Sequence, residues 1–448
     1  MGQALGAEDV VVRRWRSPED GEILRLAAPA LGALAAGPLY VLVDTAIVGH
    51  LGTVQLAALA LAGTIVATVT QLSDFLSYGT TAQVARLHGA GAERAAGGVA
   101  AQSLWLALGT GLIAAAVLAA LSSPLAEALG GRPAVNSAAG RYIALSTIGL
   151  PGMLVALAGE GVLRGFGDLR TPLRILIACN VANVTLEIGL VYGLHLGLDG
   201  SALGTVAAQL AMGALFARRM VAVPADGRRP VLARMRPLLR TGADLTVRSA
   251  ALLGAFLLAT AVAARIGTPA LGAHQVAFEL FIFLALVLDA IAIAGQIIVA
   301  RRLGAGDAAG ARRSAARMVA WALAFGTAFG LVLLAGTHLI PLAFSDDQAV
   351  RDQAARMWPL FALMQPMAAA VFALDGILIG AGDTRYLAGA MVISLAAFIA
   401  PALDAGSLRE LWVALDLLML TRLITLAVRF ARGSWLVVGA PPDAAAIG

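Results

Sequence analysis

Three polar side chains stand at a similar depth inside otherwise apolar stretches of the chain, and their types could bind a cation. Asp44 and Glu187 lie six and eight residues before the histidines that end their stretches, and Thr205 lies six residues after the aspartate near the start of its own. At a helical rise of 1.5 Å per residue, each is roughly 9–12 Å from the polar end of its stretch. A carboxylate inside a membrane costs roughly 2.5–3.5 kcal/mol, so Asp44 and Glu187 are candidates for ion coupling or substrate binding.

Glu187 shares a helix face with two amide side chains. Asn183 precedes it by four residues and Asn180 by seven, which is the spacing of one face of a helix. Lipid exposure of three such side chains is implausible, so we expect this face to be turned towards the interior of a helix bundle. The alternative interpretation is a buried hydrogen-bond network with a structural role alone.

The composition indicates that these stretches belong to an all-α membrane protein. The 448 residues are 60% hydrophobic and 13% charged, whereas ordinary soluble domains are roughly 25% charged. Twelve stretches are long enough to cross a bilayer. They cover approximately residues 23–48, 54–85, 96–121, 138–163, 172–195, 199–219, 239–264, 270–300, 314–340, 354–379, 386–404 and 409–430.

The basic residues are all arginine, apart from the histidines. A chain without lysine has neither a GxxxxGK[ST] phosphate loop nor a Schiff-base lysine, which excludes a P-loop ATP-driven pump and pyridoxal chemistry. Of the 32 arginines, 24 lie at the termini or in loops that follow even-numbered spans, and six lie in the other loops. This bias predicts that both termini are cytoplasmic, in an inner or plasma membrane. It also explains the net charge of +5 without a nucleic-acid partner.

An internal repeat relates the two halves of the chain at an offset of 215 residues. GVLRGFGDLR at 161–170 aligns with GILIGAGDTR at 376–385, and HLGTVQLAAL aligns with RIGTPALGAH. The repeat predicts two pseudo-symmetric six-helix lobes of equal orientation, as in rocking transporters. The expected parts are a cytoplasmic N-terminal segment, an N-terminal lobe, a basic cytoplasmic linker, a C-terminal lobe and a cytoplasmic tail, at 1–22, 23–220, 221–238, 239–431 and 432–448.

The polar cluster of the first half has no counterpart in the second half. The offset places Ala259 opposite Asp44, Phe398 opposite Asn183, Ala402 opposite Glu187 and Leu420 opposite Thr205. A structural requirement of the fold would tend to recur in both halves. The restriction of the cluster to one half therefore favours a function.

Other charges inside the predicted spans are weaker candidates. Asp74 and Asp289 occupy the same repeat position, which favours a structural role for both. A candidate second-lobe site comprises Arg248, Asp289 and Asp375. The alternative is that the charges of this half, including Arg422, neutralise one another in pairs.

Four longer motifs resemble those of the multidrug and toxin extrusion (MATE) family over nearly the whole chain. They are VDTAIVGHLGTVQLAALA at 43–60, SYGTTAQVARLHGAG at 77–91, GVLRGFGDLRTP at 161–172 and FALDGILIGAGDTRYLAGA at 372–390. The chain is most similar to the DNA-damage-inducible protein F subfamily. The resemblance implies twelve helices in two six-helix lobes that form a V, and transport rather than an enzyme activity.

The resemblance also implies roles for individual residues. Asp44 matches the central coupling and substrate aspartate of the first span. Asn183 and Glu187 match an Asn-x-x-x-Asp motif of the fifth span, with Glu in place of Asp. Thr205 matches a threonine of the sixth span, and Tyr142 corresponds to a tyrosine near the cation site in the fourth span.

Two further positions are compared with the family in the same way. Pro29 stands fifteen residues before the span 1 aspartate, where a proline bends the first helix in relatives. One branch of the family has acidic residues in spans 7 and 10 that take part in sodium coupling. Arg248 and Ala368 occupy those places here, so sodium coupling through the C-terminal lobe is not expected.

Together these features predict a monomeric, proton-coupled antiporter without a cofactor, which exports amphipathic cationic organic compounds by alternating access. Its partners would be the lipid bilayer and small organic substrates. Sodium held by Asp44, Asn183, Glu187 and Thr205 is the alternative coupling ion. A flippase or exporter of a lipid-linked or anionic substrate would use a cationic residue such as Arg248. A membrane-embedded transferase would need clustered acidic or histidine motifs, which the sequence lacks.

Overall fold

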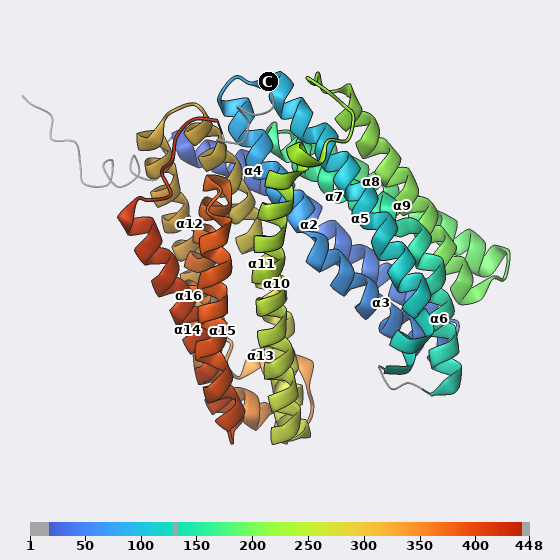
Figure 1. Ribbon diagram of the computed structural model, residues 1–448. Coiled ribbons are helices and arrows are strands. Elements are labelled where there is room, and N and C mark those ends of the chain that lie inside the picture. Colours follow the sequence, from blue (N-terminus) through green and yellow to red (C-terminus); the bar gives the residue numbers. More distant parts are fainter. Residues whose placement is uncertain (1–17, 129–131, 441–448) are drawn as a thin grey trace, which may run out of the picture. The chain divides into compact units, whose positions relative to one another are not determined.

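The computed structural model describes residues 18–128 and 132–440, and every regular element in these ranges is helical (Figure 1). Twelve helical segments there are long and apolar enough to cross a membrane. This number confirms the twelve spans predicted from the sequence. The protein is therefore a multi-pass membrane protein.

Two compact units make up the chain. The N-unit contains Gly32–Ser249 with residues 439–440, and the C-unit contains residues 18–31 with Ala250–Val438. The helices that lie wholly in the N-unit are α3 (Thr53–Ser73), α4 (Phe75–Gly89), α5 (Glu93–Ala128), α6 (Pro133–Ser146), the 3-10 turn η1 (Thr147–Gly149), α7 (Leu150–Gly165), α8 (Arg170–Ile188), the π-helical turn η2 (Gly189–Gly193) and α9 (Gly197–Ala222). Those of the C-unit are α11 (Thr268–Gly304), α12 (Ala308–Ala335), α13 (Leu339–Phe344), α14 (Gln348–Ala381), α15 (Thr384–Asp404) and α16 (Leu408–Arg432).

The remaining two helices, α2 (Pro18–Gly49) and α10 (Leu232–Ile266), are each shared between the units. They are the first helices of the two sequence halves. The units thus divide inside these helices and not within the linker 221–238, and the lobe limits given above stay a prediction.

A side chain of another helix anchors the start of each shared helix. This helix is α12 for α2 and α5 for α10. In the C-unit, Arg317 of α12 donates a 2.7 Å hydrogen bond to Asp20 at the start of α2. In the N-unit, Gln102 of α5 holds the segment before α10, donating to the Arg229 carbonyl at 2.9 Å and accepting from the Val231 amide at 3.0 Å. Gln102 and Arg317 are equivalent under the offset of 215, so the repeat extends to these anchors.

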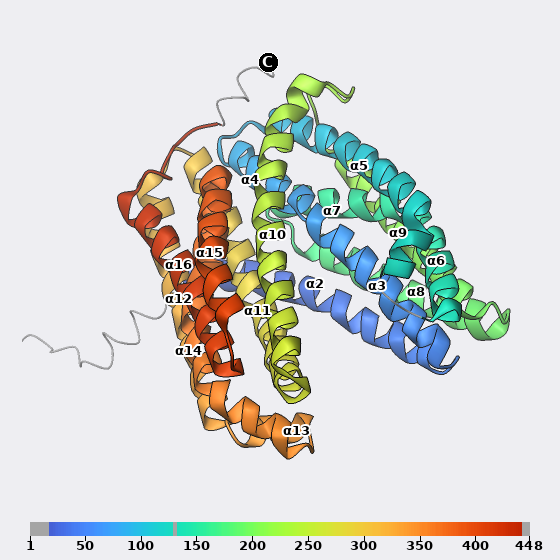
Figure 2. The ribbon, with the colours of Figure 1, turned by 60° about the horizontal axis from the view of Figure 1, so that its bottom comes forward.

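Each unit is built around one central helix, and the glycines of the repeated motif explain how it packs. In the N-unit α7 contacts α4, α5 and α9, and both ribbon views show α5, α7 and α9 side by side (Figures 1 and 2). In the C-unit α14 contacts α11, α12 and α16. A Cβ on Gly161 would lie 2.5 Å from the carbonyl oxygen of Ser77, and a Cβ on Gly376 would lie 2.2 Å from that of Ala292. These two backbone contacts are repeat equivalents, and small residues allow such close approach between membrane helices.

Asp74 and Asp289 share a repeat position but not a local structure. Asp74 separates α3 from α4, and its carbonyl oxygen accepts the amides of Ser77 and Tyr78, both at 3.0 Å. Asp289 lies inside the continuous helix α11. The common structural role expected for the two residues stays a prediction.

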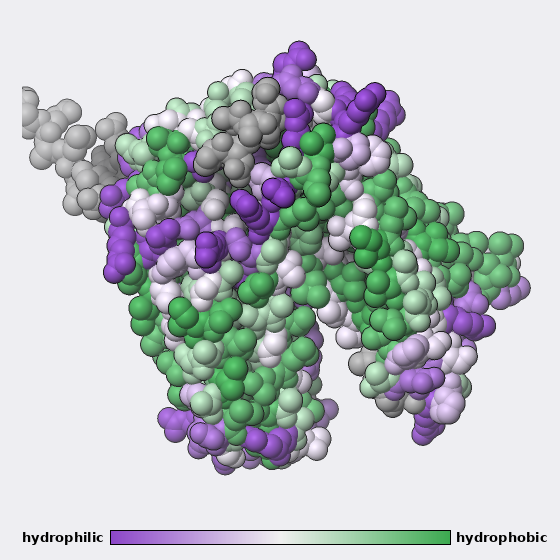
Figure 3. Space-filling view, viewed as in Figure 1, coloured by the Kyte–Doolittle hydropathy of each residue, from purple (hydrophilic) through white to green (hydrophobic). Residues whose placement is uncertain are grey.

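Large apolar side chains cover much of the surface of the units. Figure 3 shows hydrophobic residues along the middle of the helices and hydrophilic residues gathered towards the helix ends. Leu112, Ile113 and Leu331 are each more than half exposed. Such extensive apolar exposure is unfavourable in water and suits contact with lipid.

Gly376→Ala is expected to lower the free energy of unfolding by about 1–3 kcal/mol, because the new methyl group must separate α14 from α11. The measurement is the midpoint of thermal unfolding of the detergent-solubilised protein. Gly389→Ala is the matched control, since nothing lies within 4 Å of a Cβ at this position of α15. Equal midpoints for the two variants would contradict the close contact assigned to Gly376.

Candidate functional site

Five carboxylates are buried in the ranges that the structure describes, and three of them are paired with arginine. The pairs are Arg317–Asp20 at 2.7 Å, Arg164–Glu160 at 2.5 Å and Arg422–Asp375 at 2.6 Å. A buried charge is tolerated when an opposite charge and hydrogen bonds compensate its lost hydration. These three carboxylates therefore have a sufficient structural explanation.

The other two buried carboxylates, Asp44 and Glu187, lie against each other, and no arginine or histidine among the described residues pairs with either. Ser201 donates a 2.8 Å hydrogen bond to Oδ1 of Asp44. Glu187 is fully buried, and neither of its carboxylate oxygens accepts a hydrogen bond from a described group. Two adjacent carboxylates repel each other when both are ionised, so the arrangement favours a shared proton or a bound cation.

Hydroxyl and amide groups surround the two carboxylates. The hydroxyls of Tyr40 and Thr205 share a 2.8 Å hydrogen bond. The hydroxyl of the buried Tyr142 lies beside Ser201 and Thr205. Asn183 is also buried, and its Oδ1 has no hydrogen-bond donor among the described groups. The site therefore presents several oxygen atoms at one place in the N-unit.

Helical spacing explains how the site is assembled. Three helices each contribute two residues four positions apart, and α6 contributes one: Tyr40 and Asp44 on α2, Asn183 and Glu187 on α8, Ser201 and Thr205 on α9, and Tyr142 on α6. Residues at this spacing lie on one face of a helix. Gly204 allows α9 to approach α8, because a Cβ there would already lie 3.3 Å from the Cα of Glu187.

The structure brings together most of the site residues predicted from the sequence. Those that meet are Asp44, Asn183, Glu187, Thr205 and Tyr142. Asn180 lies further along α8 and donates a 3.1 Å hydrogen bond to the carbonyl of Ala36 on α2. Its contact joins two helices of the site without reaching the carboxylates.

Sequence reasoning missed two members of the site, Tyr40 and Ser201. Each precedes a predicted site residue by four positions, so the helical period alone could have indicated them. Pro29 lies inside α2, which continues through it although proline removes one backbone hydrogen bond. A bend at Pro29 stays a prediction.

One of the three candidate second-lobe residues has an arginine partner. Asp375 is bound to Arg422, which is the neutralising pair considered as the alternative. Asp289 is half-buried within α11. Arg248 lies in α10 on the N-unit side of the division, whereas Asp289 and Asp375 belong to the C-unit. No set of three or more His, Cys, Asp or Glu side chains that could hold a metal ion occurs among the described residues.

A family model described as MatE matches residues 29–188 and again residues 245–402. The chain belongs to the MATE family. Members of this family are transporters and not enzymes. The two matched ranges are displaced by about 215 residues, in agreement with the internal repeat.

Individual relatives extend over nearly the whole chain. The chain is 30% identical to the DNA damage-inducible protein F of Escherichia coli K12, over 95% of this chain and 96% of that protein. It is 31% identical to the chloroplastic protein DETOXIFICATION 44 of Arabidopsis thaliana, over 94% and 84% of the two chains. The structure of a mutant of a Vibrio cholerae MATE transporter matches with a TM-score of 0.84 at 17% identity, over 92% and 96% of the two chains. These matches confirm the family, the similarity to DNA-damage-inducible protein F and the all-α fold predicted from the sequence.

Neutralising a buried carboxylate in this MATE protein should change its stability differently according to whether the carboxylate has an arginine partner. Asp375→Asn leaves Arg422 buried without its counter-charge, which is expected to cost about 3–5 kcal/mol of unfolding free energy. Asp44→Asn removes one of two adjacent like charges and leaves no arginine unpaired, so the thermal midpoint should be unchanged or higher. Thermal unfolding of both variants in detergent at neutral pH provides the comparison. An Asp44→Asn variant as unstable as Asp375→Asn would show that Asp44 is a structural charge.

Proposed function

We propose that this MATE protein is an antiporter that exports amphipathic cationic organic compounds in exchange for protons. The observation that carries the proposal is the Asp44–Glu187 pair, which is buried in the N-unit and has no arginine partner within residues 18–128 and 132–440. In the same chain, Glu160 and Asp375 each have such an arginine. A carboxylate pair that lacks a fixed counter-charge can exchange one mobile cation for another.

Exchange follows from competition for the same negative charge. When the pair is ionised, it attracts an organic cation, and the Ser201 hydroxyl holds Asp44 in position. When a proton binds to the pair, the net charge falls and the organic cation is released. Protonated Asp44 could donate a hydrogen bond to an acceptor such as Oδ1 of Asn183, which has no donor among the described groups. Because proton and substrate do not bind productively together, inward proton flow can drive export.

The proposed orientation of the protein in the membrane and its proposed location rest on the distribution of arginine. We place both termini in the cytoplasm and the protein in the plasma membrane, because 24 arginines are assigned to that side and six to the other. The two homologous halves are the natural moving parts of an alternating-access cycle. The functional form would be a monomer, since the complete carboxylate site lies within the N-unit of one chain.

Sodium is the second candidate for the coupling ion. Hard cations are bound by oxygen ligands, and this site offers carboxylate, amide and hydroxyl oxygens. Oδ1 of Asn183 and both carboxylate oxygens of Glu187 accept no hydrogen bond from described groups, which leaves them available for a cation. Asp44 and Thr205 would complete the ligand set.

A flippase or exporter for an anionic substrate has less support. Such a protein needs a cationic side chain that is free to meet its substrate. Arg422 is buried against Asp375 at 2.6 Å and is therefore already neutralised. Arg248 on α10 is the other arginine that the sequence suggested for that role.

Export by the purified protein in proteoliposomes tests the proposal. An imposed proton gradient should drive uptake of a fluorescent lipophilic cation into those proteoliposomes in which the wild-type protein is oriented inside-out. Asp44→Asn and Glu187→Gln should each lower the initial rate by at least about tenfold, because one of the two charges that attract the cation is lost. A sodium gradient applied after the proton gradient is collapsed by an ionophore distinguishes the coupling ions.

Asp199→Asn is the matched control, since it removes a carboxylate near the start of α9, outside the buried pair. It should transport at the wild-type rate. Undiminished proton-driven transport in both site variants would refute the proposed role of the pair. If Asp44→Asn left transport unchanged while substitution of Arg248 abolished it, the result would favour the flippase.

A further inference from the structure

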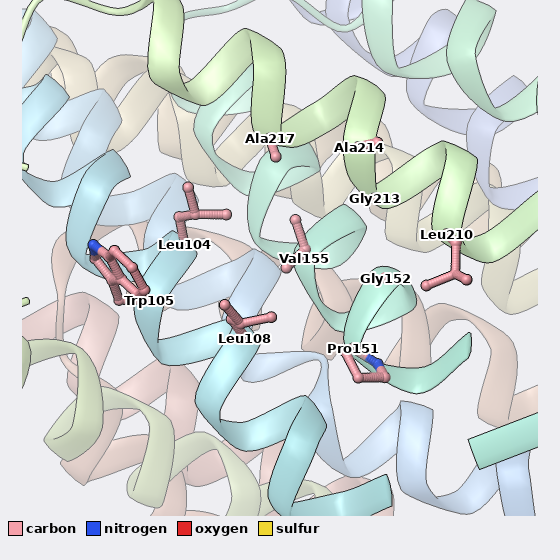
Figure 4. Close-up of a pocket in the computed structure, with 10 residues that line it drawn as sticks. All are labelled: Leu104, Trp105, Leu108, Pro151, Gly152, Val155, Leu210, Gly213, Ala214 and Ala217. Atoms are coloured by element: carbon pink, nitrogen blue, oxygen red, sulfur yellow. The ribbon is translucent and has the colours of Figure 1, made fainter. Parts of the chain in front are cut away.

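An apolar groove runs along the surface of the N-unit, between helices α5, α7 and α9 (Figure 4). Its volume is about 350 Å³. Leu104 and Leu108 of α5 form one wall, Val155 of α7 lies at the floor, and Leu210 of α9 forms the opposite wall. The groove is separate from the Asp44–Glu187 site, and none of its lining residues belongs to that site.

Small residues create the groove. A Cβ on Gly213 of α9 would lie 2.5 Å from the carbonyl oxygen of Gly152 on α7, so these two helices touch through their backbones. Ala214 and Ala217 continue the same side of α9 and add only methyl groups. The larger side chains of α5 and α9 therefore lie on either side of the groove, and none of them fills it.

A tryptophan and an arginine stand where the groove approaches the linker. A second hollow of about 110 Å³ shares Leu104 and Trp105 with the first and is also lined by Arg228. Trp105 is 42% exposed, and its indole nitrogen donates a 2.7 Å hydrogen bond to the carbonyl of Arg228. Tryptophan at such a position is typical of the level of lipid headgroups.

Arg228 carries a positive charge that no described carboxylate neutralises. Its guanidinium donates to the backbone carbonyls of Val221 and Val223, the latter at 3.2 Å. The nearby Arg94, in contrast, is bound to Asp226 at 2.5 Å. The segment 218–240 contains seven arginines and one acidic residue, so the surroundings of this end of the groove are strongly positive.

We propose that this groove binds an anionic phospholipid, with one acyl chain between α5 and α9 and the phosphate on Arg228. An acyl chain matches the apolar lining, and a guanidinium can donate two hydrogen bonds to one phosphate group. The arginine-rich segment favours a headgroup with net negative charge over a zwitterionic one. The lipid belongs to the leaflet on the side of the segment 223–231, which joins α9 to α10.

Quenching of Trp105 fluorescence by brominated lipids tests the site in the full-length protein. Nanodiscs would contain equal mole fractions of either brominated phosphatidylglycerol or brominated phosphatidylcholine in an unbrominated background. The difference between the wild type and Trp105→Phe isolates the signal of this tryptophan. We expect phosphatidylglycerol to quench it with an apparent preference of about fivefold, and we expect Arg228→Gln to abolish that preference.

Two further variants separate the groove from general electrostatic attraction. Arg229→Gln removes the same charge one residue away and should keep the preference, because Arg229 does not line either hollow. Ala214→Leu fills the groove from an exposed position and should reduce quenching by phosphatidylglycerol without changing any charge. Equal quenching of the wild type by the two lipids would overturn the proposal. If Arg228→Gln and Arg229→Gln lowered the preference for phosphatidylglycerol equally, the proposal would be overturned as well, since basic charge alone would then explain the preference.

Discussion

The cost of an ionised carboxylate inside an apolar helix bundle is the constraint on which the rest of this structure depends. Two of the three arginine-paired carboxylates, Glu160 and Asp375, stand at equivalent repeat positions on the central helices α7 and α14. Asp44 and Glu187 are the exception, because each has the other as its charged neighbour. Among the described residues no fixed positive charge compensates this pair, and the proposed exchange of a proton for an organic cation rests on that difference.

The two central helices show how one repeat position can be neutralised in two ways. In the N-unit the arginine is Arg164, one helical turn further along the same helix as Glu160. In the C-unit it is Arg422, which comes from α16 and reaches Asp375 on α14. Neutralisation is thus retained between the halves although the residue that supplies it has changed. The repeat preserves the physical requirement, while the sequence positions that meet it have diverged.

Backbone contact is the second property that the halves share. Gly161 and Gly376 let α7 and α14 touch the helices beside them at equivalent points. The polar site, in contrast, belongs to one half only. Ser201 has Asp416 as its repeat equivalent, but the positions equivalent to Asp44 and Glu187 are alanines. Packing therefore explains the common architecture of the two units, and the unshared polar residues explain how one unit came to hold the site.

The sequence by itself determined the twelve spans, the repeat and the family, and it named five of the residues that meet in the N-unit, because hydropathy, period and rare intramembrane charges are local properties of a chain. It could not decide which carboxylates have arginine partners. Arg422 and Asp375 are far apart in sequence, and only the packing of α14 against α16 brings them to 2.6 Å. Tertiary structure also added Tyr40 and Ser201, whose hydroxyls gain significance from the neighbours they meet across helices. The division of α2 and α10 between two units was equally a matter of contacts, since each helix is continuous in sequence and in hydropathy.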